Sequence, residues 1–127
     1  MEINEKEYCS TNGIVKFAGI HLIIELWNPK NTTSLSKVES IFREAVKACD
    51  ATLLNVELHE FSPYGGVSGV GILKESHISI HSWPEYNYAA LDIFVCGTVN
   101  PYKAIPVIKK GFETSQIQIT EVKRGIF

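Results

Sequence analysis

The stretch GGVSGVGILKESHISIHSWPEYNYAALDIFVCG, residues 65–97, decides the fold of this chain. Apolar and polar residues alternate in three runs within it, at about 67–74, 77–83 and 89–96. A period of two puts alternate side chains on opposite faces of a β-strand, so each run is predicted to be a strand. Turns that contain glycine or proline separate most of the strands, which favours antiparallel pairing.

Three more alternating runs lie outside this stretch, at 17–27, about 52–61 and 115–122. The first reads FAGIHLIIELW, is rich in β-branched and aromatic residues, and is followed by Asn28-Pro29, which ends the strand. The last reads SQIQITEV. Together with the central stretch, these runs predict one antiparallel sheet.

Two segments are predicted to be helical. Apolar residues in 34–49 recur at the i, i+3, i+4, i+7 spacing of one helix face. A second helix begins at Asn100-Pro101 and runs toward Gly111, with Pro106 as a kink or an early stop. The predicted fold is an α+β two-layer sandwich, an antiparallel sheet with two helices on one face.

Length and composition favour one globular domain over 1–127, with a polar leader at 1–13. The chain is 45% hydrophobic and 20% charged, which is ordinary for a soluble protein. Its net charge of −2 gives no electrostatic support for a nucleic-acid or membrane-surface partner. No apolar run reaches the roughly 18 residues of a membrane span, and the N-terminus lacks the apolar core of a secretion signal. We therefore expect a cytoplasmic protein.

The three cysteines, Cys9, Cys49 and Cys96, are widely spaced and form no C-x-x-C pair. An odd number with this spacing argues against a disulfide framework and against a zinc ribbon. Cys49 lies on the apolar stripe of the first predicted helix, where a cysteine packs as a small hydrophobic residue. A functional cysteine in this chain is therefore expected to act alone as a thiol.

Reactive side chains are concentrated in the central stretch. Eight of them fall within 29 residues: Ser68, Glu75, Ser76, His77, His81, Glu85, Asp92 and Cys96. A metal site made by His77, His81 and Cys96 is disfavoured, because four residues along a strand span roughly 13 Å. A hydrolase triad with Ser76 and His81 is also disfavoured, because no G-x-S-x-G elbow precedes a helix. No metal is expected.

A third interpretation rests on three motifs: GGVSGV (65–70), ESHISIHSWPEY (75–86) and ALDIFVCG (90–97). In sequence, order and spacing they resemble the prokaryotic pyruvoyl-dependent S-adenosylmethionine decarboxylase family. The resemblance extends more weakly to HLIIEL (21–26), HEFSPYG (59–65) and EVKRG (121–125). It therefore covers most of the chain beyond the leader.

The resemblance implies that the chain makes its own cofactor. Ser76 attacks the carbonyl of Glu75, and elimination then cuts the chain into a β chain, 1–75, and an α chain, 76–127. Position 76 becomes a pyruvoyl group, whose ketone forms a Schiff base with the substrate amine. Decarboxylation of an amino acid needs such an electron sink, because no ordinary side chain accepts the electrons left on Cα.

The resemblance also assigns roles to five further residues. Ser68 and His81 match residues that assist the self-cleavage, and a histidine suits proton transfer near neutral pH. Cys96 matches the catalytic acid that returns a proton to Cα. Glu85 matches the residue that binds the ribose hydroxyls, and Phe61 matches an aromatic residue that stacks on adenine.

Three histidines keep less specific assignments. The role of His77, next to the cut, is open between site wall and structure, whereas His21 and His59 are expected to be structural. On the last strand of the central stretch, Asp92 and Cys96 share one face, opposite the apolar residues.

Two alternatives remain open. The same pyruvoyl chemistry serves arginine or ornithine, although Glu85 and Phe61 favour S-adenosylmethionine. A non-processing paralogue that regulates an active partner is the second alternative, and the retained Ser76, His81 and Cys96 argue against it. The resemblance further implies a homodimer of αβ units, with sites near or across the interface.

Overall fold

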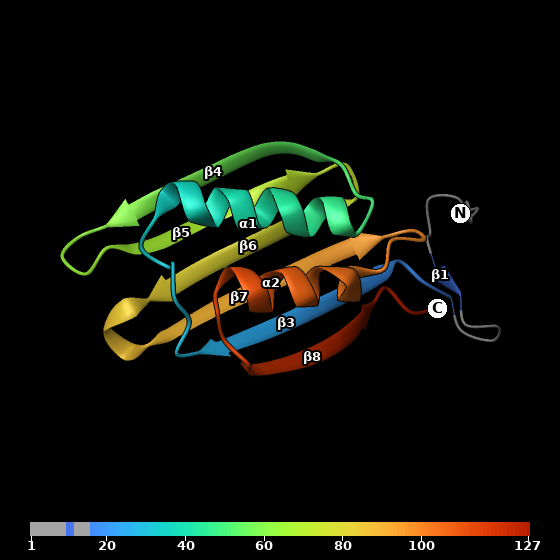
Figure 1. Ribbon diagram of the computed structural model, residues 1–127. Helices are drawn as coiled ribbons and strands as arrows, with labels where there is room; N and C mark the ends of the chain where they lie inside the picture. Colours follow the sequence, from blue (N-terminus) through green and yellow to red (C-terminus); the bar gives the residue numbers. More distant parts are fainter. Residues whose placement is uncertain (1–9, 12–15) are drawn as a thin grey trace.

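The computed structural model of the chain describes residues 10–11 and 16–127. They form a six-stranded antiparallel sheet in the order β4-β5-β6-β7-β3-β8, with both helices on one face (Figure 1). The strands are β3 Gly19–Trp27, β4 Leu53–Phe61, β5 Gly66–Leu73, β6 Ser76–Trp83, β7 Tyr88–Cys96 and β8 Gln116–Arg124. A short separate ladder pairs β1, Ser10–Thr11, with β2, Lys16–Phe17. The predicted two-layer α+β sandwich is confirmed, whereas the rest of the predicted leader lies outside the described residues.

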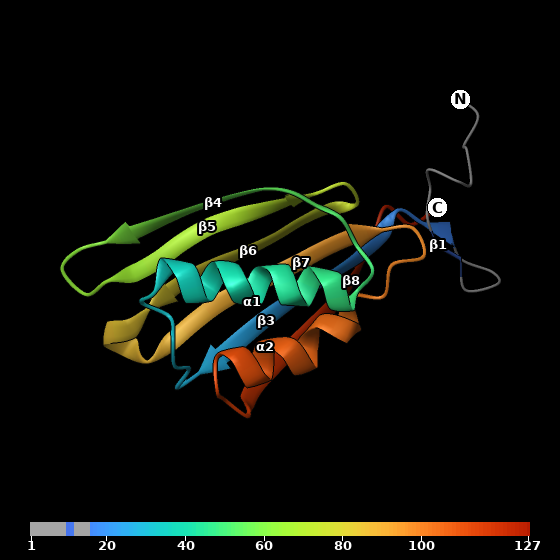
Figure 2. The same ribbon diagram turned by 45° about the horizontal axis from the view of Figure 1, so that its top comes forward.

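The first helix, α1, spans Leu35–Ala48, as its apolar periodicity predicts. Ser34 caps its start, because the Ser34 side chain accepts a hydrogen bond from the backbone N–H of Lys37 at 3.2 Å. The helix lies beside α2 on the same face of the sheet (Figure 2). No helix among the described residues is long and apolar enough to cross a membrane.

The second helical segment differs from its prediction. Its first turn, Pro101–Ala104, is a 3₁₀ helix (η2), and α2 then spans Ile105–Gly111. Pro106 is the second residue of α2, directly after the change from the 3₁₀ turn to the α-helix, and it does not end the helix. In the first turn of a helix a backbone N–H has no partner within the helix, so the proline there removes no hydrogen bond.

The core lies between the helices and one face of the sheet. On β7, Leu91, Ile93 and Val95 are buried against the helices, while the residues between them face the other way. Cys49 is 7% exposed in this core, and burial raises the pKa of its thiol. The predicted packing role of Cys49 is therefore confirmed.

The opposite side of the sheet, which bears Ser68, His81, Asp92 and Cys96, is called the open face below. No described helix or strand covers it (Figures 1 and 2). Large apolar side chains on it are partly exposed to solvent: Ile23 (39%), Ile72 (45%) and Val122 (37%). A surface of this kind is typical of a contact with a ligand or another chain.

Candidate active site

The predicted cleavage bond lies at a tight turn between two strands. Leu73, the last residue of β5, pairs with Ser76, the first of β6, and only Lys74 and Glu75 connect them. The Glu75 carboxylate accepts a hydrogen bond from the backbone N–H of Thr52 at 3.0 Å. The Glu75 carbonyl accepts one from the backbone N–H of Cys96 at 3.1 Å. The carbonyl that would be attacked is thus held next to the predicted proton donor.

Ser76 breaks the regular geometry of β6. Its φ of 149° lies in a region that residues with a side chain rarely adopt, and such a conformation costs about 1–3 kcal/mol. Ser76 pairs with Val95, whose side chain is buried against the helices. The Ser76 hydroxyl nevertheless lies 3.3 Å from Nδ1 of His77, its neighbour in sequence. The strained backbone therefore turns the hydroxyl toward His77.

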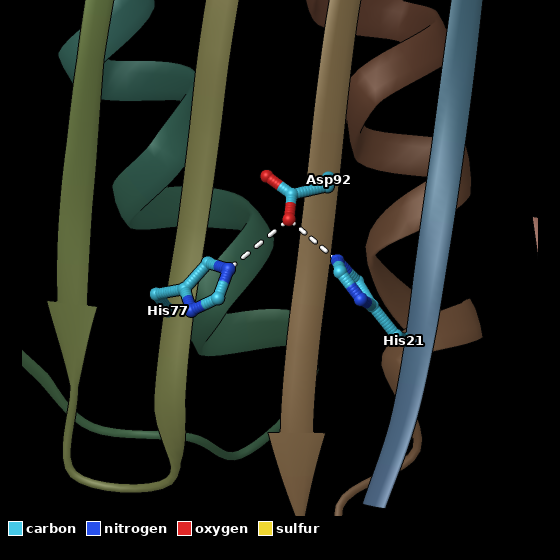
Figure 3. Close-up of side chains that lie close together, drawn as sticks. All are labelled: His21, His77 and Asp92. Carbon is cyan, nitrogen blue, oxygen red and sulfur yellow. Dashed lines mark hydrogen bonds and ion pairs between the residues drawn. The ribbon is translucent and has the colours of Figure 1, made fainter. Parts of the chain in front are cut away.

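A polar network on the open face continues from His77. Its Nε2 lies 3.0 Å from Oδ2 of Asp92, and Nε2 of His21 lies 2.5 Å from the same oxygen (Figure 3). The hydroxyl of Ser79 donates to Oδ1 of Asp92. On the far side, Nη1 of Arg124 lies 3.1 Å from Nδ1 of His21. Four strands, β6, β7, β3 and β8, thus contribute to one hydrogen-bonded network.

The contacts fix the charge of Asp92. Burial raises the pKa of its carboxyl group, but hydrogen bonds from Ser79, His21 and His77 outweigh burial and bring the pKa below its ordinary value. Asp92 is therefore ionised at neutral pH and only accepts hydrogen bonds. Both histidines must then donate from Nε2 to its carboxylate.

The same contacts bear on metal binding. The ligand atoms of His21, His77 and Asp92 lie within 4.8 Å of one another, which is close enough for one ion. An ion on Nε2 of His21 would shift the histidine proton to Nδ1. That proton would then face the guanidinium of Arg124, which only donates hydrogen bonds and cannot accept one from Nδ1. The donor set therefore fits a hydrogen-bonded network and does not fit a metal ion.

A second group of predicted residues lies farther along the sheet. Ser68 and His81 are directly paired across β5 and β6. The His81 ring stacks on Trp83 at 3.8 Å and lies parallel to the Phe61 ring at 6.5 Å. A cavity of about 310 Å³ opens here, and we call it the aromatic pocket. It is lined by Phe61, Ser62, Pro63, Tyr64, Gly66, His81, Ser82, Trp83 and Glu85.

The structure thus brings the predicted substrate residues Phe61 and Glu85 together with His81. It does not bring that group to the cleavage bond. Ser76 and His81 are five residues apart on one strand, which corresponds to about 16 Å. An open groove of about 470 Å³, lined by Ser68 and Asp92 among others, lies between the two groups.

Sequence reasoning missed the network around Asp92. His21 was expected to be structural, yet it contacts the Asp92 carboxylate directly. Arg124 was missed because the last strand was predicted to end at residue 122, whereas β8 continues to Arg124, which pairs with Gly19. Alternation correctly put Asp92 and Cys96 on one face. It gave no information on which distant strand lies beside them.

Comparisons with known proteins agree with the motifs. The family model for S-adenosylmethionine decarboxylase matches residues 20–125. The S-adenosylmethionine decarboxylase proenzyme of Thermomicrobium roseum is 47% identical over 113 residues, which are 88% of this chain and 97% of that protein. The proenzyme of Methanococcus maripaludis strain C5 is 48% identical over 115 residues, 88% of this chain and 93% of that protein.

A solved structure is similar as well. The crystal structure of the adenosylmethionine decarboxylase from Aquifex aeolicus VF5 superposes with a TM-score of 0.78 at 29% identity. The match covers 87% of this chain and 93% of that one. The likeness therefore extends over most of both chains.

Proposed function

The chain belongs to the S-adenosylmethionine decarboxylase family, and from this premise we propose that it decarboxylates S-adenosylmethionine with a pyruvoyl group made from its own Ser76. One domain spans 1–127 and is cut between Glu75 and Ser76. The observation that carries the proposal is the strained serine, whose hydroxyl contacts His77 while the preceding carbonyl is held by Cys96. The relatives' name, proenzyme, fits a chain that must be processed.

The residues around position 76 fit this group. A pyruvoyl group supplies a ketone for the substrate amine and a neighbouring carbonyl that withdraws electrons as carbon dioxide leaves. Cys96 lies at the end of β7, where its backbone already contacts the cut, so its thiol is well placed to return a proton to Cα. Cys96 is partly exposed on the open face, as a proton donor to a bound substrate must be.

Recognition of the nucleoside is assigned to the aromatic pocket. Phe61 is 49% exposed there, so its ring face is available for stacking on adenine. Glu85 follows Trp83-Pro84 on the wall of the same pocket, where its carboxylate accepts hydrogen bonds from paired ribose hydroxyls. Ser68 and His81 assist the self-cleavage.

The separation of the two groups supports a homodimer of αβ units. Within one copy, Ser76 and Cys96 cannot reach the aromatic pocket, because Ser76 and His81 are about 16 Å apart. Two copies packed open face to open face in opposite directions would bring the cleavage bond of one copy over the pocket of the other. The partly exposed Ile23, Ile72 and Val122 would be buried in this contact.

A direct assay tests the proposed activity. The purified protein is incubated separately with S-adenosylmethionine, arginine and ornithine labelled in the carboxyl group, and released carbon dioxide is measured. We expect release from S-adenosylmethionine alone, and none from the Ser76→Ala variant. Release from arginine or ornithine alone would contradict the proposal.

A further inference from the structure

We propose that His77 is the base that removes the hydroxyl proton of Ser76 in the self-cleavage reaction, and that Asp92, His21 and Arg124 are positioning residues that hold it in the required form. The inference rests on the proposed function, because it describes how the same serine is activated. It gives a role to a histidine whose assignment the sequence left open, and to three residues to which the resemblance assigned no role.

The contact with Asp92 determines the tautomer of His77. Its Nε2 faces the ionised carboxylate of Asp92 at 3.0 Å and must carry the proton. In the neutral ring Nδ1 then has a free lone pair, and this atom lies 3.3 Å from the Ser76 hydroxyl. Serine, histidine and aspartate thus form a chain in which each group fixes the state of the next, as in other serine nucleophiles.

Hydrogen bonds from the neighbouring strands hold the Asp92 carboxylate in place. His21 donates to the same oxygen as His77, and Ser79 donates to the other oxygen, so the carboxylate has little freedom to turn. Arg124 donates to Nδ1 of His21, which leaves the His21 proton on Nε2, toward Asp92. The Asp92 carboxylate is 23% exposed and the His21 side chain 16%, so water competes weakly for these bonds.

The Phe94 ring packs against the side chains of this network. The rings of His77 and His21 lie against Phe94 with centroids 6.0 and 5.3 Å away. The guanidinium of Arg124 lies 5.3 Å over the same ring. The packing holds all three cationic or titratable side chains in place around Asp92.

The proposed step balances without any external reagent. As Oγ of Ser76 bonds to the carbonyl carbon of Glu75, its proton passes to Nδ1 of His77. The negative charge that develops on the carbonyl oxygen faces the backbone N–H of Cys96, 3.1 Å away. The carbon–nitrogen bond then breaks and the nitrogen takes the proton back from His77. The products are an ester through Oγ and a free amine.

The later steps need only a base and water. Loss of the Cα proton of residue 76 expels the Glu75 carboxylate and leaves dehydroalanine, which tautomerises, adds water and loses ammonia. His81 is too far from Ser76 in the same copy to serve in the first step. The two histidines are therefore assigned to separate steps, His77 within one copy and His81 from the partner copy.

Substitutions at His77 test whether this residue acts as a base or has only a structural role. Full-length wild type, His77→Ala and His77→Asn are made by cell-free synthesis, and intact and cleaved chains are followed over time on denaturing gels. Asn still accepts a hydrogen bond from Ser76 but cannot take its proton, so both variants should be cleaved at least about 100-fold more slowly. Hydroxylamine, which cleaves esters, should release no fragments from them.

Imidazole provides the decisive readout. The His77 side chain is 35% exposed, so imidazole from solution can enter the space left in His77→Ala and accept the proton. Cleavage of this variant should accelerate in proportion to imidazole concentration, while wild type is unaffected. Asp92→Asn, which presents an amide donor to Nε2 and so favours the wrong tautomer, should also be slow. Glu121→Gln on β8 is the matched loss of a carboxylate and should cleave normally.

The outcomes distinguish this inference from the proposed function. Wild type that stays intact would contradict the proposed function itself. Wild type that is cleaved, together with His77→Asn cleaved at the same rate, would overturn the role of His77 alone. A slow, folded His77→Ala variant that imidazole does not accelerate would overturn it as well.

Discussion

The backbone N–H of Cys96 donates a hydrogen bond to the carbonyl oxygen of Glu75 across 3.1 Å. The two residues are 21 positions apart, and the pairing of β6 with β7 brings them together. One strand end therefore serves two purposes. Its backbone holds the carbonyl at the proposed cleavage bond, and its thiol is the proposed proton donor for the later decarboxylation.

Replacement of the Cys96 thiol should separate these two purposes. In Cys96→Ala the backbone N–H remains, so cleavage at Glu75–Ser76 should continue, while kcat for decarboxylation should fall about 10²- to 10⁴-fold. Gel analysis measures cleavage and carbon dioxide release measures kcat. Cys49→Ala is the matched control, because Cys49 is buried in the core and its loss should lower the unfolding free energy without lowering kcat. Full activity in Cys96→Ala would refute its assignment as catalytic acid.

The charge of Asp92 should appear in the pH dependence of stability. Its pKa is lower in the folded than in the unfolded chain, so as the pH falls the unfolded chain takes up the proton first. In a Ser76→Ala background, Asp92→Asn should lower the unfolding free energy by about 2 kcal/mol at pH 7. The difference should hold down to about pH 5 and shrink as the pH falls below about 4.

Denaturant titrations at a series of pH values measure this difference. Glu44→Gln should change the unfolding free energy by less than about 0.5 kcal/mol over the same pH range, because Glu44 lies on the exposed side of α1. A difference for Asp92→Asn that grows toward low pH would contradict the proposed charge state.

The aromatic pocket should determine the affinity for the nucleoside and leave self-cleavage intact. Phe61→Ala and Glu85→Gln should each raise KM for S-adenosylmethionine about 10- to 100-fold, because stacking and charged hydrogen bonds of this kind contribute about 1–3 kcal/mol. Steady-state kinetics on fully cleaved protein measures the change. Tyr86→Ala, at a neighbouring residue outside the pocket lining, should keep the wild-type KM. An unchanged KM in Phe61→Ala would show that adenine does not stack on Phe61.

Mixed dimers should show which histidine acts within one copy and which acts between copies. In the proposed homodimer, a Ser76→Ala copy has no nucleophile but still offers His81 to its partner. Co-expression with His81→Ala should therefore restore cleavage of the His81→Ala chain. Co-expression of Ser76→Ala with His77→Ala should not restore it, because His77 must lie beside the serine that it activates. Differently tagged copies make the cleaved chain identifiable, and the opposite pattern would refute both assignments.

The fold could be predicted largely because its elements are local. The alternation of apolar and polar residues in 77–83 and 89–96 is enough to predict β6 and β7. The helical spacing of apolar residues in 34–49 is enough to predict α1. The end of β8 could not be predicted in this way. Its last residues are a strand because they pair with β3, and Gly19 and Arg124 are more than a hundred residues apart.

In the candidate site, roles could be predicted only for residues that match the motifs of the family. The strained φ of Ser76 and the contact of His21 with Asp92 leave no trace in spacing or composition. Both depend on how β6, β7 and β3 are aligned, which is a property of the assembled sheet. The division of the site between two distant parts of the open face also required the register of the strands.

Mass spectrometry of the purified, denatured protein detects the proposed cut between Glu75 and Ser76 directly. We expect two fragments, 1–75 and 76–127, of which the second begins with a pyruvoyl group and has no free amine, together with an uncut Ser76→Ala chain. An intact wild-type chain after prolonged incubation, or a second fragment with a free serine amine, would contradict it.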